Sequence, residues 1–182
     1  MKCFTVKQLQ LLSCLLLGSV FLVGCNAAKP VDPKVVQELR GKYMLAEEPA
    51  DPEGVLDLRE TLKQPQDVVL IAQVGGVPDP WTKGKASFVV SDPSMASVED
   101  DGQDHKSPGH DPATCPFCSR KLDATKGLAL VQFVDDKGQV VAVDARDLFG
   151  IAPQQLVVVR GRAEQDSTGN LVVSASGLFV RK

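Results

Sequence analysis

The chain has 182 residues, and its 20 basic and 23 acidic side chains give a formal net charge of −3 at pH 7. An acidic chain is a poor candidate for a nucleic-acid-binding protein, because such proteins draw most of their affinity from Lys and Arg side chains that neutralise phosphates. The length suits a single domain with its own hydrophobic core.

The N-terminal segment has the layout of a cleavable signal peptide. It begins with two lysines and no acidic residue, and an apolar run follows over residues 11–23. A permanent membrane-spanning helix needs about 20 apolar residues, so this run is too short, and no second run of this kind follows it. We therefore expect residues 1–24 to be a signal peptide that is removed on export, and the body that follows to be soluble.

The apolar run ends in Leu22-Val23-Gly24-Cys25, where a small residue precedes a cysteine. This motif resembles the lipobox of bacterial lipoproteins. The resemblance implies cleavage after Gly24, a diacylglyceryl thioether on Cys25 and usually a third acyl chain, such as palmitate, on the freed amine. Two or more chains hold a protein on a bilayer. We expect an exported protein, anchored in a membrane through Cys25 and facing the periplasm or the cell exterior; the alternative is an ordinary signal peptide that happens to end in cysteine.

Residues 25–31 are predicted to form the lipidated tether, and residues 32–66 an N-terminal helical segment. Asp32 can cap a helix and is followed by proline, which suits the first helical position; apolar residues then recur at helical spacing up to Tyr43. Prolines and a glycine interrupt this pattern. Residues 55–62 beyond them could form a second short helix or an edge strand.

The rest of the chain, residues 67–182, is rich in strand patterns. Asp144 and Gly150 can cap a short helix at residues 145–149, between two groups of strands. Turn residues separate the other segments. The predicted strands are residues 68–77, 85–92, 128–134, 139–143, 156–163 and 171–180.

This order resembles the OB-fold, a five-stranded Greek-key barrel found in binders of oligonucleotides and oligosaccharides. The resemblance covers residues 67–181. The segments that carry it are Val74-Gly75-Gly76-Val77, Phe88-Val89-Val90-Ser91-Asp92, Val157-Val158-Val159-Arg160-Gly161 and Leu171-Val172-Val173-Ser174-Ala175. We therefore predict a mainly β fold: a small OB-fold-like barrel of five or six strands, with one or two short N-terminal helices.

One departure from the OB-fold pattern is an insertion, residues 93–127, where strands two and three are usually joined tightly. A long polar insertion in a compact domain is usually functional or disordered. It holds both histidines of the protein and, since Cys25 is assigned to lipid, both cysteines left in the body: His105, His110, Cys115 and Cys118. Two thiolates separated by two residues can take adjacent corners of a tetrahedral metal site, and the histidines can supply the other corners.

The segment Cys115-Pro116-Phe117-Cys118-Ser119-Arg120-Lys121 resembles half of a zinc knuckle. Arg120 and Lys121 would favour the ligating thiolate forms of the cysteines. Sulfur and imidazole ligands suit zinc, and an exported site rich in sulfur could equally hold copper as Cu(I). The predicted cofactor is therefore zinc or copper.

Several alternatives to the metal site stay open. Outside the cytoplasm, Cys115 and Cys118 could simply form a disulfide. Cys-Pro-Phe-Cys also looks like a glutaredoxin active site, which would make the chain a thiol redox protein, but prolines and a glycine precede it in place of the buried strand that this family needs. Covalent haem attachment requires histidine directly after the second cysteine, where this chain has Ser119.

Trp81 is the only tryptophan and follows the first predicted strand of the barrel. It lies near a face that OB-folds often use for ligands, so it could stack on a sugar or a base. The alternative is a packing role at one end of the barrel.

Nothing in the sequence predicts an enzyme: no nucleophile with a positioned base, no phosphate loop and no paired carboxylates stand out. We expect a non-enzymatic binding module of the cell envelope, anchored in the membrane, with a Cys/His metal site in its insertion. The second hypothesis is a module that binds an envelope protein or a saccharide, with a structural Cys115–Cys118 disulfide. The third is a thiol redox protein.

Overall fold

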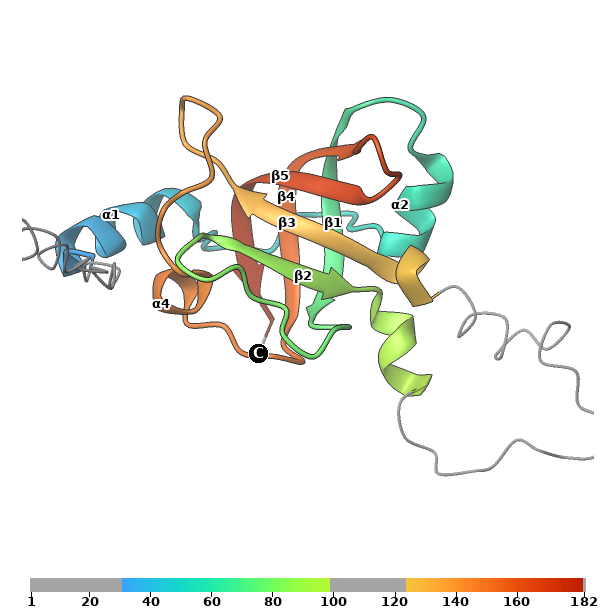
Figure 1. Ribbon diagram of the computed structural model, residues 1–182, viewed down its shortest axis with the longest axis horizontal. Helices are drawn as coiled ribbons and strands as arrows, with labels where there is room; N and C mark the ends of the chain where they lie inside the picture. The colour runs from blue at the N-terminus through green and yellow to red at the C-terminus, as the bar shows by residue number, and fades with distance from the viewer. Residues whose placement is uncertain (1–30, 99–123, 182) are drawn as a thin grey trace, which may run out of the picture.

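The structure is a computed structural model that describes residues 31–98 and 124–181 (Figure 1). Within those ranges, no helix is both long and apolar enough to span a bilayer. The α-helices are α1 (Pro33–Tyr43), α2 (Val55–Thr61) and α4 (Ala145–Phe149), and two 3₁₀ helices are η2 (Pro93–Val98) and η3 (Ala124–Gly127). The strands are β1 (Gln66–Val74), β2 (Ser87–Ser91), β3 (Leu128–Phe133), β4 (Leu156–Gln165) and β5 (Leu171–Val180).

The five strands close into a barrel in the order β1-β2-β3-β5-β4 (Figure 1). Neighbouring strands are antiparallel except β3 and β5, which are parallel. The helix α4 lies between β3 and β4 in the chain. The predicted fold class, a mainly β, small OB-fold-like barrel, is therefore confirmed, with five strands.

The sixth predicted strand, residues 139–143, is wrong. Only a single bridge joins Val134 to Val140 in this region. The reason is that β3 has no edge left for another strand, because β2 pairs with one edge and β5 with the other. The segment instead continues as irregular chain with bends at residues 142 and 143, and it buries Val141 and Val143 in the core.

A bulge at Ser176 in β5 lies opposite Arg160 and Gly161 of β4, where the backbones of the two strands come into close contact. The register between the two strands shifts between Arg160 and Gly161. A β-carbon added to Gly161 would lie 2.4 Å from the carbonyl oxygen of Ser174 and 2.8 Å from Cα of Ala175. Glycine opposite the bulge allows this close approach of the two backbones.

Phe133 lies at the centre of an aromatic cluster that joins the barrel to two helices. Its ring centroid is 4.5 Å from that of Phe149 in α4, 5.4 Å from Tyr43 at the end of α1, and 6.4 Å from Phe88 in β2. All four side chains are at most 6% exposed. Such pairs contribute about 0.5–1.5 kcal/mol beyond their burial, so the cluster fixes α1 and α4 at one end of the barrel.

The segment between α1 and α2 completes the hydrogen bonding of two strands. Leu45 N–H donates to Leu178 O in β5 (2.8 Å), Glu53 N–H donates to Val69 O in β1 (2.9 Å), and Ile71 N–H donates to Glu53 O (2.9 Å). The segment thus runs from β5 to β1 and crosses behind the strands in the view of Figure 1. The predicted N-terminal helical segment is therefore packed into the barrel.

Local signals at the helix ends behave as predicted. The side chain of Asp32 accepts a hydrogen bond from Lys34 N–H at the start of α1, and Asp144 does the same for Arg146 in α4. Gly150 ends α4 in the left-handed conformation (φ 67°). Of the two alternatives for residues 55–62, the structure has the helix, α2.

Two Gly→Ala variants should change stability in opposite directions. Gly161→Ala should lower the free energy of unfolding by about 1–3 kcal/mol, because its new methyl group meets backbone atoms that cannot rotate away. Gly41→Ala should raise it by about 0.5–1 kcal/mol, because Gly41 lies inside α1 and nothing stands within 4 Å of an added β-carbon. Urea unfolding measures both; equal effects of the two variants would contradict the close approach at β4.

Candidate functional site

The barrel holds the two ends of the insertion side by side. Ser91 at the end of β2 is the register partner of Leu128 at the start of β3, and Asp92 N–H donates to Gly127 O (2.8 Å). The 3₁₀ helices η2 and η3 follow and precede these strands (Figure 1). Residues 93–127 therefore leave and re-enter the barrel at a single place, which we call the base of the insertion.

Asp92 links the base of the insertion to α2. Its side chain is buried, with 6% exposure, and it accepts hydrogen bonds from Leu56 N–H (3.0 Å), Ser94 N–H (2.9 Å) and the Ser94 hydroxyl (2.6 Å). The residue before α2, Gly54, provides no side-chain cap itself, and a β-carbon there would lie 2.7 Å from Oδ2 of Asp92. The carboxylate thus acts as the N-terminal cap of α2 from a distant part of the chain.

The hydrogen bonds to Asp92 also fix its charge. Burial alone would raise the pKa of Asp92, but hydrogen bonds from the Ser94 hydroxyl and from backbone N–H groups outweigh burial and leave the pKa below its ordinary value of 3.8. The folded protein therefore holds a buried carboxylate, not a carboxylic acid, at neutral pH.

Arg59 of α2 makes a second link to the base of the insertion. Its guanidinium donates to Lys126 O (2.8 Å) and Leu128 O (3.0 Å), on either side of the re-entry point, and to Gly169 O (2.8 Å) in the turn between β4 and β5. Three carbonyl groups from two connections are thereby held by one side chain. Together, Asp92 and Arg59 fix both ends of the insertion to α2.

The sequence did not identify Asp92 and Arg59 as important residues. For Asp92 a signal existed, since Asp-Pro-Ser is a typical sequence for an aspartate that accepts hydrogen bonds from the backbone two residues on. For Arg59 no signal existed, because its partners are carbonyl groups more than 60 residues away, and any residue supplies a carbonyl.

The predicted metal site cannot be compared with the structure. The predicted lipidation site and the four predicted metal ligands lie outside the described residues: Cys25, His105, His110, Cys115 and Cys118. In residues 31–98 and 124–181, no group of three or more His, Cys, Asp or Glu side chains is placed to hold a metal ion. The roles assigned to these residues therefore stay predictions. The structure does show where the two ends of the insertion that contains the four metal ligands lie.

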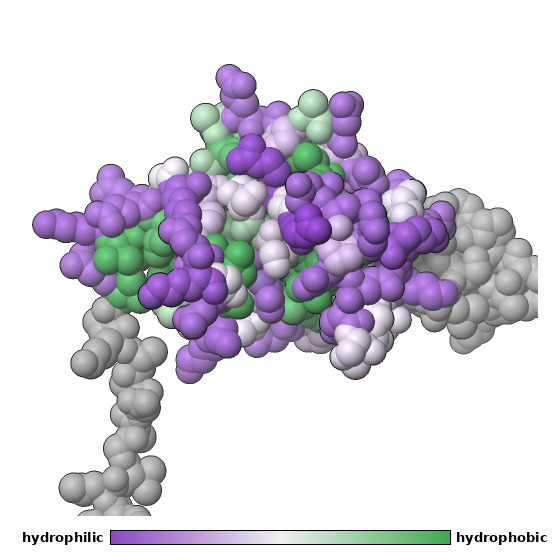
Figure 2. All heavy atoms as spheres, turned by 90° about the horizontal axis from the view of Figure 1, so that it is seen from above, coloured by the Kyte–Doolittle hydropathy of each residue, from purple (hydrophilic) through white to green (hydrophobic). Residues whose placement is uncertain are grey.

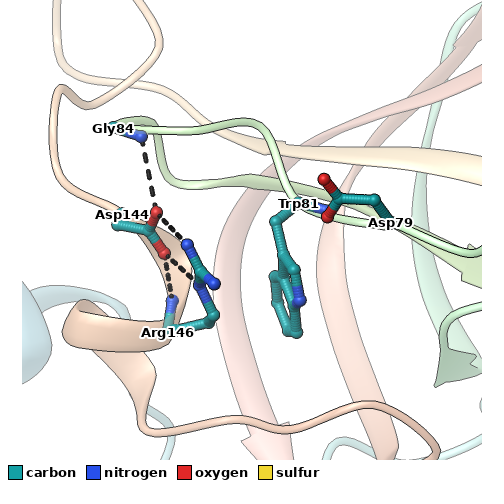
Figure 3. A network of polar contacts seen from close by, with 5 residues as sticks. All are labelled: Asp79, Trp81, Gly84, Asp144 and Arg146. Carbon is teal, nitrogen blue, oxygen red and sulfur yellow. Dashed lines mark hydrogen bonds and ion pairs between the residues drawn. The ribbon is translucent and has the colours of Figure 1, made fainter.

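Trp81 packs against the hydrophobic core. Its backbone forms an isolated antiparallel bridge with Phe88, and the centroids of the two rings are 5.9 Å apart. The guanidinium of Arg146 in α4 lies 5.6 Å from the centre of the indole ring (Figure 3). These contacts agree with the packing interpretation of Trp81. Since part of the indole remains exposed, a ligand-stacking role stays a prediction.

Asp144 holds Arg146 beside Trp81. Its carboxylate accepts from Nε (2.9 Å) and Nη2 (2.8 Å) of Arg146, from the Arg146 N–H (3.1 Å) and from Gly84 N–H (3.4 Å) (Figure 3). The side-chain hydrogen bonds from Arg146 lower the pKa of Asp144 from its ordinary value to about 2. The same carboxylate thus caps α4, joins it to the loop before β2 and orients the cation over the indole.

The loop after β1 covers the outer face of β2. Gly76 has φ +83°, and a β-carbon there would lie 2.7 Å from Cβ of Ser91. Ser87 and Ser91 alternate with core residues and so point out of the barrel, yet they are only 1% and 6% exposed. Among the described residues, the two ends of the outer face of β2 are therefore covered, while Val89 between them is half-buried.

Comparison of the sequence with protein-family models and with curated proteins gives no match. The fold alone does not establish an activity, since unrelated functions share the same small barrels. The function of this chain must therefore be argued from its own residues. Of the described residues, those with the clearest role near the predicted ligands are Asp92 and Arg59, which hold the base of the insertion.

Replacing Asp92 should change how stability depends on pH. Because its pKa is lower in the folded protein, its contribution to stability is present above about pH 4 and is lost as the pH falls through the folded pKa. Asp92→Asn should lower the free energy of unfolding at pH 7 by about 1–3 kcal/mol and flatten the loss of stability below pH 4. Urea unfolding at several pH values measures this; Asp57→Asn, at an exposed position of the same helix, is the control and should change stability by less.

Replacing Arg59 should loosen the base of the insertion. Arg59→Lys keeps the charge but loses the planar fork that reaches three carbonyl groups, so it should cost about 1–2 kcal/mol. Hydrogen exchange should rise at η3 and in the turn between β4 and β5. Arg162→Lys, at an exposed position of β4, should leave both segments unchanged; an equal rise in exchange there would contradict a specific role of Arg59.

Proposed function

We propose that this protein is a lipid-anchored binding module of the bacterial cell envelope, in which the barrel presents a metal-binding loop for zinc or copper. It is exported, held on its membrane by acyl chains on Cys25, and has no enzymatic activity. The observation that carries the proposal is the base of the insertion, where Asp92 N–H donates to Gly127 O and both ends of the loop are fixed.

The base of the insertion suits metal binding by the loop that it carries. Bringing the ends of a long loop together costs conformational entropy. Folding of the barrel already holds these ends together, so a metal ion does not have to close the loop when it binds. Hydrogen bonds also hold the segments nearest the base. The buried carboxylate of Asp92 binds one end, and the guanidinium of Arg59 binds the other. A loop on such a base loses less freedom when its ligands gather around an ion.

The residues proposed to hold the ion have the right chemistry for zinc or Cu(I). Cys115 and Cys118 offer two thiolates, and His105 and His110 offer two imidazoles. When bound, zinc in a closed four-ligand site stabilises a fold, whereas copper in an open site can be passed to a partner. The chain's own contribution is to keep the cysteines close in sequence and both ends of their loop on one rigid barrel.

Metal analysis of residues 26–182 tests the proposal. We expect about one equivalent of zinc or copper per chain, lost in both Cys115→Ser and Cys118→Ser and reduced in His105→Ala and His110→Ala. Ser119→Ala, next to the second cysteine, is the control and should keep the metal. Loss of metal from the control as well would point to unfolding of the loop and not to loss of a ligand.

Other results of this experiment support the rival functions. Metal-free protein with an intact Cys115–Cys118 disulfide that resists reduction would contradict the metal site and favour a module that binds an envelope protein or a saccharide. A disulfide that exchanges readily, with a measurable mild potential, would favour a thiol redox protein. Anchoring is tested separately by acyl incorporation, which Cys25→Ala should abolish.

A further inference from the structure

The start of α1 exposes apolar side chains to solvent. Val31 and Val35 are 39% and 42% exposed, and they are the large apolar residues that stand out as exposed within the described residues. Val31 precedes the helix cap and Val35 lies in the first turn of α1. Isolated apolar residues on a surface need no explanation, but here both lie in one short stretch, so their location matters.

Among the described residues, Val36 and Leu39 of α1 pack against the core, and the side-chain hydrogen bonds from α1 to the barrel come from its second half. Arg40 donates from Nε to Leu148 O (2.7 Å), and the Tyr43 hydroxyl donates to Val134 O (2.8 Å). The first half extends to the side of the barrel in Figure 1, and Figure 2 shows apolar surface at the same side of the molecule. The exposed valines thus lie at the outer end of α1, and Val35 is exposed while its neighbour Val36 packs against the core.

The proposed lipid anchor brings this part of the helix close to a membrane. Cys25 and Val31 are six residues apart in the sequence. Each residue of a fully extended chain spans at most about 3.5 Å, so Val31 lies within about 20 Å of the acylated cysteine. The opposite end of the barrel has no such constraint.

The chemistry of the first turn suits a bilayer surface. Lys34 lies next to Val35 and is exposed, and a basic side chain beside apolar ones can contact lipid phosphates. The exposed carboxylate of Asp32 accepts a hydrogen bond from Lys34 N–H at the helix start, so the turn has no net charge. Two valines are too few to hold a free protein on a membrane. Once acyl chains hold the chain there, however, the contact becomes intramolecular, and a weak interaction is enough.

We propose that the first turn of α1, with Val31, Lys34 and Val35, lies in the headgroup region of the bilayer that carries the lipid anchor. The inference rests on the proposed acylation of Cys25. The contact gives the barrel one preferred orientation on the membrane: the end with α1 and α4 faces the bilayer, and the base of the insertion, beside α2 at the other end (Figure 1), faces away from it.

The test uses the single tryptophan of the chain. In a Trp81→Phe background, Val35→Trp places a fluorescent probe in the first turn of α1, and Gln37→Trp is the matched control. Both positions are exposed, and they lie about 200° apart around the helix, on opposite sides of the line that faces the barrel. The full acylated protein is reconstituted into vesicles of phosphatidylethanolamine and phosphatidylglycerol, with and without bromine on the acyl chains.

We expect the probe at position 35 to emit at shorter wavelength in vesicles and to lose at least half of its intensity with brominated lipid, while the probe at position 37 changes little. Equal emission at position 35 in both kinds of vesicle, with the protein still floating with the membrane, overturns the inference and leaves the anchor intact. A blue shift without quenching indicates that protein covers the turn, which also overturns it. Protein that carries no acyl chain and does not float overturns both the anchor and the inference.

Discussion

Closure of the barrel is the constraint on which the rest of the structure depends. The five strands close the barrel but leave part of two edges unpaired, because β1 pairs with β2 over only two residues and β5 pairs with β3 over only its first half. The segment between α1 and α2 pairs with the remaining edges, at Leu178 and at Val69 and Ile71. Exposed strand edges invite pairing with other chains, so this segment also protects the protein from edge-to-edge association.

The same segment leads into α2, the helix that covers the second end of the barrel. α1 and α4 cover one end through the cluster around Phe133, and α2 covers the other end, where the insertion begins and ends (Figure 1). Because Asp92 and Arg59 connect α2 to this end, the N-terminal helices position the candidate site as well as filling the core. The proposed metal-binding loop therefore depends on residues that a comparison of barrel strands alone would leave out.

The sequence predicted what local residues determine. Asp32, Asp144 and Gly150 mark helix ends by contacts within a few residues, and strand-forming segments between turn residues marked all five strands of the barrel. The predictions from sequence were wrong or missing where contacts with distant segments determine the local structure. Residues 139–143 have a strand pattern but find both edges of β3 occupied, and Arg59 binds carbonyl groups that carry no sequence signal. The choice between helix and strand for residues 55–62 likewise depended on Asp92, 36 positions further along the chain from Leu56.

The pairing of the N-terminal segment with β5 has a consequence for the order in which the chain can fold. Met44 forms a bridge with Leu178, and Arg181 donates to Glu48. Contacts between residues so far apart in the sequence form slowly, because closing the long loop between them costs conformational entropy. The segment after α1 can therefore take its final place only once β5 has been made. Docking of α1 and of the segment that follows it is thus a late step, which depends on the last strand of the barrel.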